Sequence, residues 1–265
     1  MPELPEVETW RRLAEKHVLG KTIQSVYAAK DDIIFDQTTP GTFKRVLEGR
    51  VVTALLRKGK HLWMELDQRP WPYFHFGMSG SFQVYSDPNE RPTYCKVEWT
   101  MADGTRLGYR NVRRIGKVRL WDDPAAVPPV SKLGFDPFLD MPSPKEFHAQ
   151  LTRRKAPVKA ILLDQGFAAG VGNWIADEIL FQAGVHPEKR CHELKDEEVK
   201  RIRSKMNTII RKAVAVAADA ERFPKTWLFH HRWGKQAGAE TANGHKVAFI
   251  TVGGRTTAFV PDLQI

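Results

Sequence analysis

The residues that are best suited to take part in a chemical reaction lie at the start of the chain, whose sequence is MPELPEVE. Because proline is a small second residue, we expect removal of Met1, which leaves Pro2 with a secondary amine. An ordinary α-amine titrates near ~8, so a fair fraction is unprotonated at neutral pH and can attack an aldehyde-level carbon. Glu3 is a neighbouring carboxylate that can transfer the protons this attack requires. The pattern indicates amine-based covalent catalysis; the alternative is that Pro2 only protects the terminus while the carboxylates suit a helix start.

Two further segments place reactive or exposed groups on predicted turns. The segment RKGK (57–60) lies between two strand-like runs, so that a hairpin tip would present Lys60 to a phosphate; otherwise such lysines only solvate a sheet edge. The segment HFGMSG (75–80) predicts a tight loop that exposes Met78. An apolar side chain at that point can fill a gap in a base stack, and the alternative is an ordinary core methionine.

Two glycine-rich segments indicate phosphate binding. LLDQG (162–166) and GVGNWIADE (170–178) predict a helix that ends at Gly166 and another that begins near Asn173. Such a turn directs backbone N–H groups and a helix amino terminus outward, and Asn173 adds an amide donor. At 253–255 the sequence GGR places Arg255 on a short hairpin, where a guanidinium can bind a phosphate with two hydrogen bonds.

The elements that position these segments follow from the hydrophobic pattern. Residues 6–18 have helical spacing, and short β-rich runs follow at 22–27, 51–56, 61–66, 80–85, 94–101 and 117–121, with a hairpin turn at Asp103-Gly104. We expect two packed sheets in this amino-terminal part. The proline-rich stretch 124–144 predicts a linker. Beyond it, an apolar stripe over 199–217 predicts an amphipathic helix, and 246–251 and 257–260 predict two short strands.

Composition limits the class of protein. A chain of 265 residues with 42% hydrophobic content favours two domains. It has no long apolar run and no secretory leader, which predicts an intracellular protein without a membrane span: cytoplasmic (nucleoid) in a bacterium, nuclear in a eukaryote. The net charge of +10 favours nucleic acid as partner. The two cysteines lie far apart and the histidines lack ligand spacing, so we expect no metal site and no disulfide.

Together, the PELPEVE start, RKGKHLW, HFGMSG, LLDQG with GVGNWIADE, and GGRTT carry a resemblance. The chain resembles the formamidopyrimidine-DNA glycosylase/endonuclease VIII family of base-excision repair enzymes over essentially its whole length. The resemblance implies an α+β multidomain fold. Its parts are an N-terminal helix plus β-sandwich (1–123), a linker (124–144), a helix–two-turn–helix DNA-binding domain (145–222) and a finger β-hairpin (223–265).

The resemblance also implies roles for residues at matching positions. Pro2 resembles the nucleophile that attacks the sugar C1′ of the damaged nucleotide, and Glu3 the adjacent proton-transfer carboxylate. Glu6 matches a further acidic position of the terminal motif. Lys60 matches the hairpin lysine that contacts the DNA backbone at the lesion.

Other matching positions concern the DNA around the lesion. Asn173 and Arg255 resemble the pair that holds the lesion-flanking phosphates, and Lys159 resembles a phosphate-contacting lysine. Met78 and Arg113 resemble void-filling residues that replace the everted base. Ile115 stands where the family usually has a phenylalanine; it can still act as a wedge but stacks less well beside the orphaned base.

Two more departures shape the expectation. Most family members end in a four-cysteine zinc finger, which two cysteines cannot build, so the chain resembles the zincless-finger branch. We expect its hairpin to be held by packing through Trp227, Phe229, Phe249 and Phe259. The stretch 219–233 is too short for the long loop that caps 8-oxoguanine in bacterial relatives.

The resemblance therefore implies a monomeric, cofactor-independent DNA glycosylase and abasic-site lyase that acts on double-stranded DNA. Its expected substrates are formamidopyrimidines and hydantoins, with weak action on 8-oxoguanine, through a Pro2 Schiff base and β,δ-elimination. Two alternatives remain open at this point: a glycosylase that prefers oxidised pyrimidines, and a non-catalytic protein that binds damaged DNA.

Overall fold

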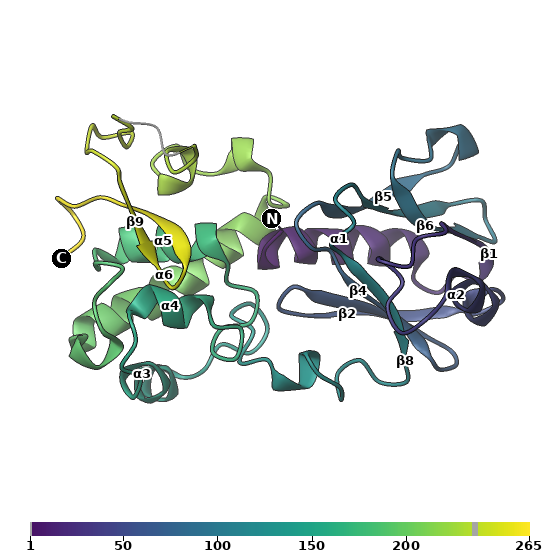
Figure 1. Ribbon diagram of the computed structural model, residues 1–265, viewed down its shortest axis with the longest axis horizontal. Coiled ribbons are helices and arrows are strands. Elements are labelled where there is room, and N and C mark those ends of the chain that lie inside the picture. Colours follow the sequence, from purple (N-terminus) through teal and green to yellow (C-terminus); the bar gives the residue numbers. More distant parts are fainter. Residues whose placement is uncertain (1, 235–237) are drawn as a thin grey trace. The chain divides into compact units, whose positions relative to one another are not determined.

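The computed structural model describes residues 2–234 and 238–265, and the chain forms two compact units, 1–132 and 133–265 (Figure 1). Met1, whose removal we expect, lies outside the described residues. The division between the units falls inside the predicted linker 124–144. The finer domain limits stay predictions.

The first unit combines helix α1 (Leu4–Val18) with two antiparallel four-stranded sheets. One sheet has the order β1-β6-β7-β5, with bounds Ile23–Ala28, Cys95–Met101, Arg106–Asn111 and Gly80–Tyr85. The other has the order β2-β3-β4-β8, with bounds Val52–Lys58, His61–Leu66, Trp71–His75 and Lys117–Trp121. A short helix α2 (Pro40–Leu47) and the 3₁₀ turns η1 (Pro88–Glu90) and η2 (Val130–Lys132) complete the unit.

The core of this unit joins both sheets and both helices. Phe74 of β4 and Trp99 of β6 are buried, and their rings meet edge to face with centroids 5.3 Å apart. Val7 and Val18 of α1 are fully buried in the same cluster, as the helical spacing predicts. The α+β class with a helix on two packed sheets is therefore confirmed.

Two elements of the first unit were not predicted from the sequence. Strand β4 and helix α2 lie in stretches for which no element was expected, whereas β7 is the second strand of the hairpin predicted at Asp103-Gly104. Pro72 in β4 hides the strand pattern, since proline lacks the N–H that a central strand donates. Helix α2 is short and begins at the cap Thr39, whose side chain accepts from Thr42 N at 3.1 Å.

The second unit is helical and ends in a hairpin. Its helices are α3 (Pro144–Thr152), α4 (Val158–Leu163), α5 (Asn173–Ala183) and α6 (Asp196–Ala215), with 3₁₀ turns η3 (Cys191–Glu193), η4 (Ala220–Arg222) and η5 (Leu228–His230). The predicted apolar stripe is buried along α6, from Val199 to Ala213. A glycine-rich turn joins α4 to α5, as the sequence predicts.

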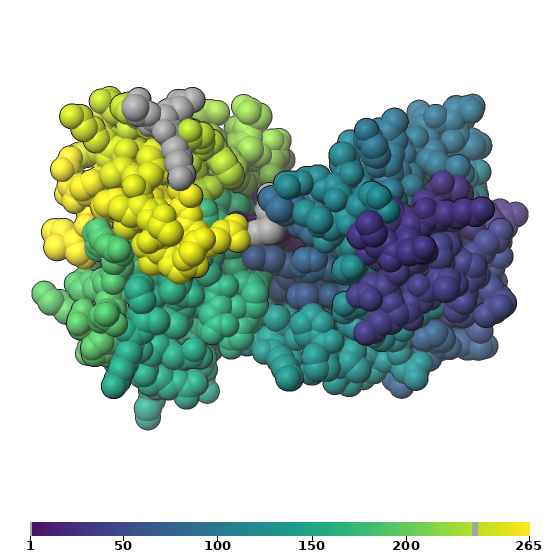
Figure 2. All heavy atoms as spheres, in the orientation of Figure 1, coloured from purple at the N-terminus to yellow at the C-terminus, as the bar shows by residue number. Residues whose placement is uncertain are grey.

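The terminal hairpin pairs β9 (Ala248–Val252) with β10 (Arg255–Phe259) around Gly253 and Gly254, whose φ values are +58° and +71°. Figure 2 shows this C-terminal segment, in yellow, at the surface of the second unit. Beneath it a small apolar cluster contains Leu228, Val247, Ala258 and Val260, with Phe249 against it.

A separate aromatic cluster forms beside α5. There Trp227 and Phe229 pack with Trp174 and Phe223, while Phe259 contacts His186. Of the four aromatic residues expected to hold the hairpin, Phe249 alone joins the cluster beneath it. The four aromatic side chains therefore pack in three separate places and do not form one core under the hairpin.

The described residues were also examined for a membrane-spanning helix and for a cluster of metal ligands. Among the described residues, no helix combines the length and apolar character needed to cross a bilayer. Within residues 2–234 and 238–265, no three His, Cys, Asp or Glu side chains gather in a way that could hold a metal ion.

Candidate active site

The amino end of α1 holds two carboxylates beside residue 2. Glu3 is the helix N-cap; its side chain accepts from the backbone N–H of Glu6, and the Glu3 N–H donates to Glu6 Oε2 at 3.0 Å. This reciprocal capping fixes both side chains relative to the start of the chain. The Glu3 residue is only 2% exposed. The helix start therefore provides a sheltered pair of acid–base groups next to Pro2.

The two carboxylates are close enough to influence each other's protonation. Burial, together with the neighbouring charge of Glu3, raises the pKa of Glu6 to about 7 from the usual 4.5. Hydrogen bonds from backbone N–H groups offset this only in part. A carboxyl group that titrates near neutral pH is suited to give and take protons under physiological conditions.

Replacement of Glu6 by Gln is expected to flatten the pH dependence of stability. In the unmodified protein the folded-state pKa of about 7 lies above the ordinary value of 4.5, so between these values the folded state keeps a proton that the unfolded chain releases. The free energy of unfolding therefore falls as pH rises through this window, by about 1–2 kcal/mol once partial exposure is allowed for. Urea unfolding at a series of pH values measures this free energy for both proteins. Parallel plots of the free energy of unfolding against pH would contradict the raised pKa of Glu6.

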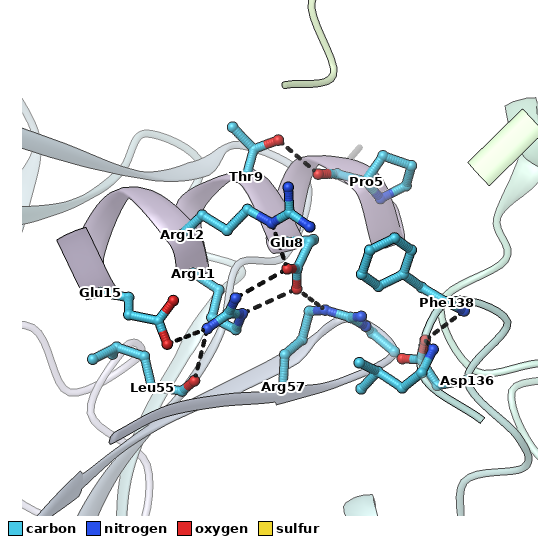
Figure 3. A network of polar contacts seen from close by, with 12 residues as sticks. Pro5, Glu8, Thr9, Arg11, Arg12, Glu15, Leu55, Arg57, Asp136 and Phe138 are labelled. Atoms are coloured by element: carbon cyan, nitrogen blue, oxygen red, sulfur yellow. Dashed lines mark hydrogen bonds and ion pairs between the residues drawn. The ribbon is translucent and has the colours of Figure 1, made fainter. Parts of the chain in front are cut away.

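A buried ion-pair network connects α1 to the β2–β3 hairpin (Figure 3). Glu8 is 2% exposed and accepts from Arg57 Nε at 3.0 Å and from Arg11 at 3.1 Å. These guanidinium partners lower the pKa of Glu8 although burial opposes its ionisation. Arg57 also donates from Nη1 to the carbonyl of Gly59 at 2.9 Å. Arg57 thus holds the turn that carries Lys60 at a fixed position relative to α1.

Lys60 itself lies on the predicted hairpin tip. Lys58 pairs with His61 across the turn, and Gly59 has a φ of +58°, which favours glycine. Behind the turn, the His61 and His75 rings are 5.0 Å apart. Burial lowers the pKa of His75 to about 4 and that of His61 to about 3, so both imidazoles are neutral at pH 7.

Two loops of the first unit bring together the three residues predicted to fill a void. The Arg113 N–H donates to Ser79 Oγ at 3.0 Å, and Arg113 Nη1 lies 3.5 Å from Met78 Sδ. A Cβ on Gly77, whose φ is +63°, would come within 2.6 Å of the Ile115 carbonyl oxygen, so only glycine allows this approach. Met78 and Ile115 are 43% and 42% exposed. The loops 77–80 and 112–116 therefore present one mixed apolar and cationic surface.

The second unit brings Asn173 to the terminal hairpin. Asn173 is the first residue of α5, and its Nδ2 donates to the carbonyl of Thr256 at 2.9 Å. Its Oδ1 is buried and has no hydrogen-bond partner among the described residues. Arg255, the residue before Thr256, is exposed at the start of β10. The start of α5 therefore contacts the terminal hairpin at the residue that follows Arg255.

The expectation that Lys159 contacts a phosphate is wrong for this structure. Lys159 is fully buried, and its Nζ bonds to Asp177 Oδ1 and to Thr257 Oγ1, the latter at 2.7 Å. Asp177 also accepts from Arg232 Nε at 3.0 Å and from the Ala258 N–H at 3.2 Å. Lys159 and Asp177 therefore fasten β10 to α4 and α5, and Lys159 has a structural role.

Breaking this buried cluster is expected to cost much stability. The Asp177→Asn variant removes the carboxylate that binds both Lys159 and Arg232 in the interior, and breaking a buried ion pair costs about 3–5 kcal/mol. The matched control Glu197→Gln removes a carboxylate that is 71% exposed and pairs with Lys200, where about 0–1 kcal/mol is expected. Urea denaturation of both variants measures the difference, and equal midpoints would contradict the assigned role.

The predicted site residues thus fall into two sets, each described within its own unit. The first unit holds Pro2, Glu3, Glu6, Lys60, Met78, Arg113 and Ile115; the second holds Asn173, Arg255 and Lys159. Sequence reasoning missed the supporting residues Glu8, Asp177 and Arg232. A signal existed for Asp177, since a charged residue interrupts the apolar run of GVGNWIADE.

Comparison with known families covers nearly the whole chain. The model of the formamidopyrimidine-DNA glycosylase N-terminal domain matches residues 1–118, and that of the formamidopyrimidine-DNA glycosylase H2TH domain matches residues 133–225. The model of the formamidopyrimidine-DNA glycosylase-like C-terminal domain matches residues 227–261.

Individual proteins agree with these matches. The formamidopyrimidine-DNA glycosylase of Arabidopsis thaliana is 41% identical over 277 residues, covering 100% of this chain and 71% of the relative. The Bacillus subtilis protein of the same name is 33% identical and covers 100% and 99%. Among solved structures, a mutant of Lactococcus lactis FPG in complex with Fapy-dG containing DNA has a TM-score of 0.86 at 28% identity, covering 99% of each chain. MutM with carbocyclic 8-oxo-G containing DNA has the same score and identity, covering 100% of each.

Proposed function

The chain belongs to the formamidopyrimidine-DNA glycosylase family and is a DNA-repair glycosylase of that type, and from this premise we propose that it excises oxidised purines and cuts the strand through a Schiff base at Pro2. The observation that carries the proposal is the sheltered Glu3–Glu6 pair beside residue 2, with the pKa of Glu6 raised to about 7. Structures of Lactococcus lactis relatives with Fapy-dG DNA and with abasic-site DNA support it.

The reaction begins with the duplex and ends with a gap. The lesion nucleotide leaves the base stack at a cost of a few kcal/mol, smaller for a poorly paired base. The Pro2 amine forms a bond to C1′ while the glycosidic bond breaks, and the base departs with a proton supplied through Glu3. The sugar ring opens to an iminium. Loss of the C2′ proton then expels the 3′ phosphate, and a second elimination expels the 5′ phosphate.

The remaining site residues hold the DNA for this chemistry. Lys60, on the turn fixed by Arg57 and Glu8, contacts the backbone at the lesion. Asn173 and Arg255 bind flanking phosphates from the second unit, and the contact of Asn173 with the Thr256 carbonyl supports their joint action. Phosphate contacts of this kind give the affinity a strong dependence on salt.

The void-filling surface of Met78, Arg113 and Ile115 replaces the everted base. Their grouping on two loops packed through Gly77 supports this role, because a wedge must be rigid to keep neighbouring bases apart. Isoleucine offers no aromatic face, so discrimination of the opposite base depends on the shape of the loop more than on stacking.

The preferred substrates are formamidopyrimidines and hydantoins rather than 8-oxoguanine. The stretch 219–233 contains the two 3₁₀ turns η4 and η5, and its Phe223, Trp227 and Phe229 pack against Trp174 of α5. This packing holds the stretch against the helix and leaves no long free loop there to cover an everted 8-oxoguanine. Selectivity then rests on how easily each lesion leaves the stack.

A competition experiment tests the substrate proposal. Duplexes with a formamidopyrimidine, a guanidinohydantoin, an 8-oxoguanine or an oxidised pyrimidine, each carrying a different dye, are incubated together with the protein. Excision of the first two at least about tenfold faster than of 8-oxoguanine is expected. Faster excision of the oxidised pyrimidine would contradict the purine preference while leaving the glycosylase activity in place.

A further inference from the structure

Two consecutive arginines of loop 112–116 point to different partners. Arg113 lies against Met78 and belongs to the void-filling surface. Arg114 instead donates from Nε to Asp31 Oδ2 at 2.9 Å and from Nη2 to Asp31 Oδ1 at 3.0 Å. This is a bidentate pair with defined geometry, which fixes orientation as well as charge. Asp31 lies 83 residues away in the sequence, in the segment that follows β1.

Asp31 is buried and hydrogen-bonded to the body of the first unit. It is 4% exposed and accepts from Lys96 Nζ at 2.7 Å and from the Ile33 N–H at 3.2 Å. The segment that carries it continues alongside β8, where the Val118 N–H donates to the Ile34 carbonyl at 2.8 Å. The carboxylate therefore forms a rigid anchor on the body of the first unit.

Arg114 is held in an unfavourable conformation. Its φ of +54° is one that residues with a side chain rarely adopt, and its side chain is 49% exposed, so burial does not explain the geometry. Such a conformation persists only where surrounding contacts impose it. The ion pair to Asp31 is the contact that the Arg114 side chain makes here. The turn that sets the direction of Arg113 and Ile115 thus depends on this pair, together with the Arg113–Ser79 hydrogen bond and the packing of Gly77 against Ile115.

We propose that the Asp31–Arg114 ion pair is a positioning device that sets the void-filling loop and thereby determines discrimination of the base opposite the lesion. The inference rests on the proposed function, in which Arg113 and Ile115 enter the void. Since Ile115 provides no aromatic face, a loop of fixed shape takes over the selection. Arg114 acts through Arg113 and Ile115 and is a positioning residue.

The first test uses the protein without DNA. Hydrogen exchange of the peptide that covers residues 112–116 is compared in the unmodified protein, Arg114→Ala and Asp31→Asn. Both variants are expected to exchange at least about tenfold faster in this peptide. Arg91→Ala is the matched control: it removes a bidentate arginine from the buried Glu98, which keeps Arg106, just as Asp31 keeps Lys96. Unchanged exchange at 112–116 in both variants overturns the inference.

The second test measures selection. Binding to duplexes with a tetrahydrofuran abasic analogue opposite each of the four bases is measured by anisotropy. The spread is the ratio of the weakest to the tightest Kd among the four opposite bases. It is expected to fall about tenfold in Arg114→Ala and in Asp31→Asn, and to stay unchanged in Arg91→Ala. Faster exchange with an unchanged spread also overturns the inference, because the pair would then stabilise the loop without selecting. If Arg114 instead bound a phosphate, Arg114→Ala alone would weaken binding to undamaged duplex.

The two proposals fail in different ways. A protein that excises no damaged base from any duplex refutes the proposed function, yet the exchange measurement on the free protein still reports on the ion pair. A protein that excises bases but keeps its opposite-base spread in both variants refutes the inference alone.

Discussion

A protein that keeps one residue ahead of Pro2 is expected to give no borohydride-trapped complex with an abasic duplex and to lose about 10³-fold or more of its lyase activity. The extra residue turns the proline nitrogen into an amide, whose lone pair is delocalised and does not attack carbon. It also moves the free amine by ~3.8 Å. The Glu3–Glu6 pair, fixed by reciprocal capping, would then face the wrong atom. Gel separation after reduction measures the trapped complex.

The control is the same protein with its terminus confirmed by mass spectrometry to begin at Pro2. Both forms are expected to bind a duplex with a tetrahydrofuran site within about threefold of each other, because phosphate contacts on other elements supply most of the affinity. Trapping by the extended form, at the rate of the processed form, would exclude the Pro2 nitrogen as the required nucleophile and point to another amine, either a lysine or the α-amine of the added residue.

The Glu3→Gln variant is expected to lose about 10²–10⁴-fold in base excision while it still forms a trapped complex on a preformed abasic site. Glutamine keeps an oxygen that can accept from the Glu6 N–H, so the helix cap survives. It cannot transfer a proton to a departing base. An abasic site already presents an aldehyde, which the amine attacks without displacing a base.

Single-turnover assays on a formamidopyrimidine duplex and on an abasic duplex separate the two steps. Glu15→Gln is the matched control, since it makes the same substitution near the far end of α1, where Glu15 pairs with Arg11. Equal losses on both substrates would show that Glu3 supports the terminus structurally and does not act in base departure.

The turns that carry the candidate site could be predicted from sequence because their chemistry is local. RKGK, HFGMSG and GGR each contain the glycine that their backbone requires, and the flanking strands 61–66, 80–85 and 117–121 have the predicted bounds. Turn residues and strand alternation act over a few positions, so a single sequence contains the whole signal.

The supporting ion pairs could not be predicted, since they depend on packing between distant segments. Glu8 and Arg57 are 49 residues apart, and Asp177 and Arg232 are 55 apart. Each looks like an ordinary surface charge until the sheet register and helix packing bring it to its partner. Lys159 is the clearest example, since the resemblance predicts a contact with a DNA phosphate, whereas in the fold its Nζ bonds to Asp177.

The anchoring of the terminal hairpin on Asp177 has a consequence for the conditions under which the protein works. Zinc fingers in which thiolates hold the metal are vulnerable to oxidants and to chelators, because both remove ligands or metal. Here β10 is fastened by a carboxylate, a lysine and an arginine, and neither cysteine of the chain lies in the hairpin. Peroxide and zinc chelators leave these carboxylate, ammonium and guanidinium groups chemically untouched. The position of Arg255 is thereby insulated from the stress that makes repair necessary.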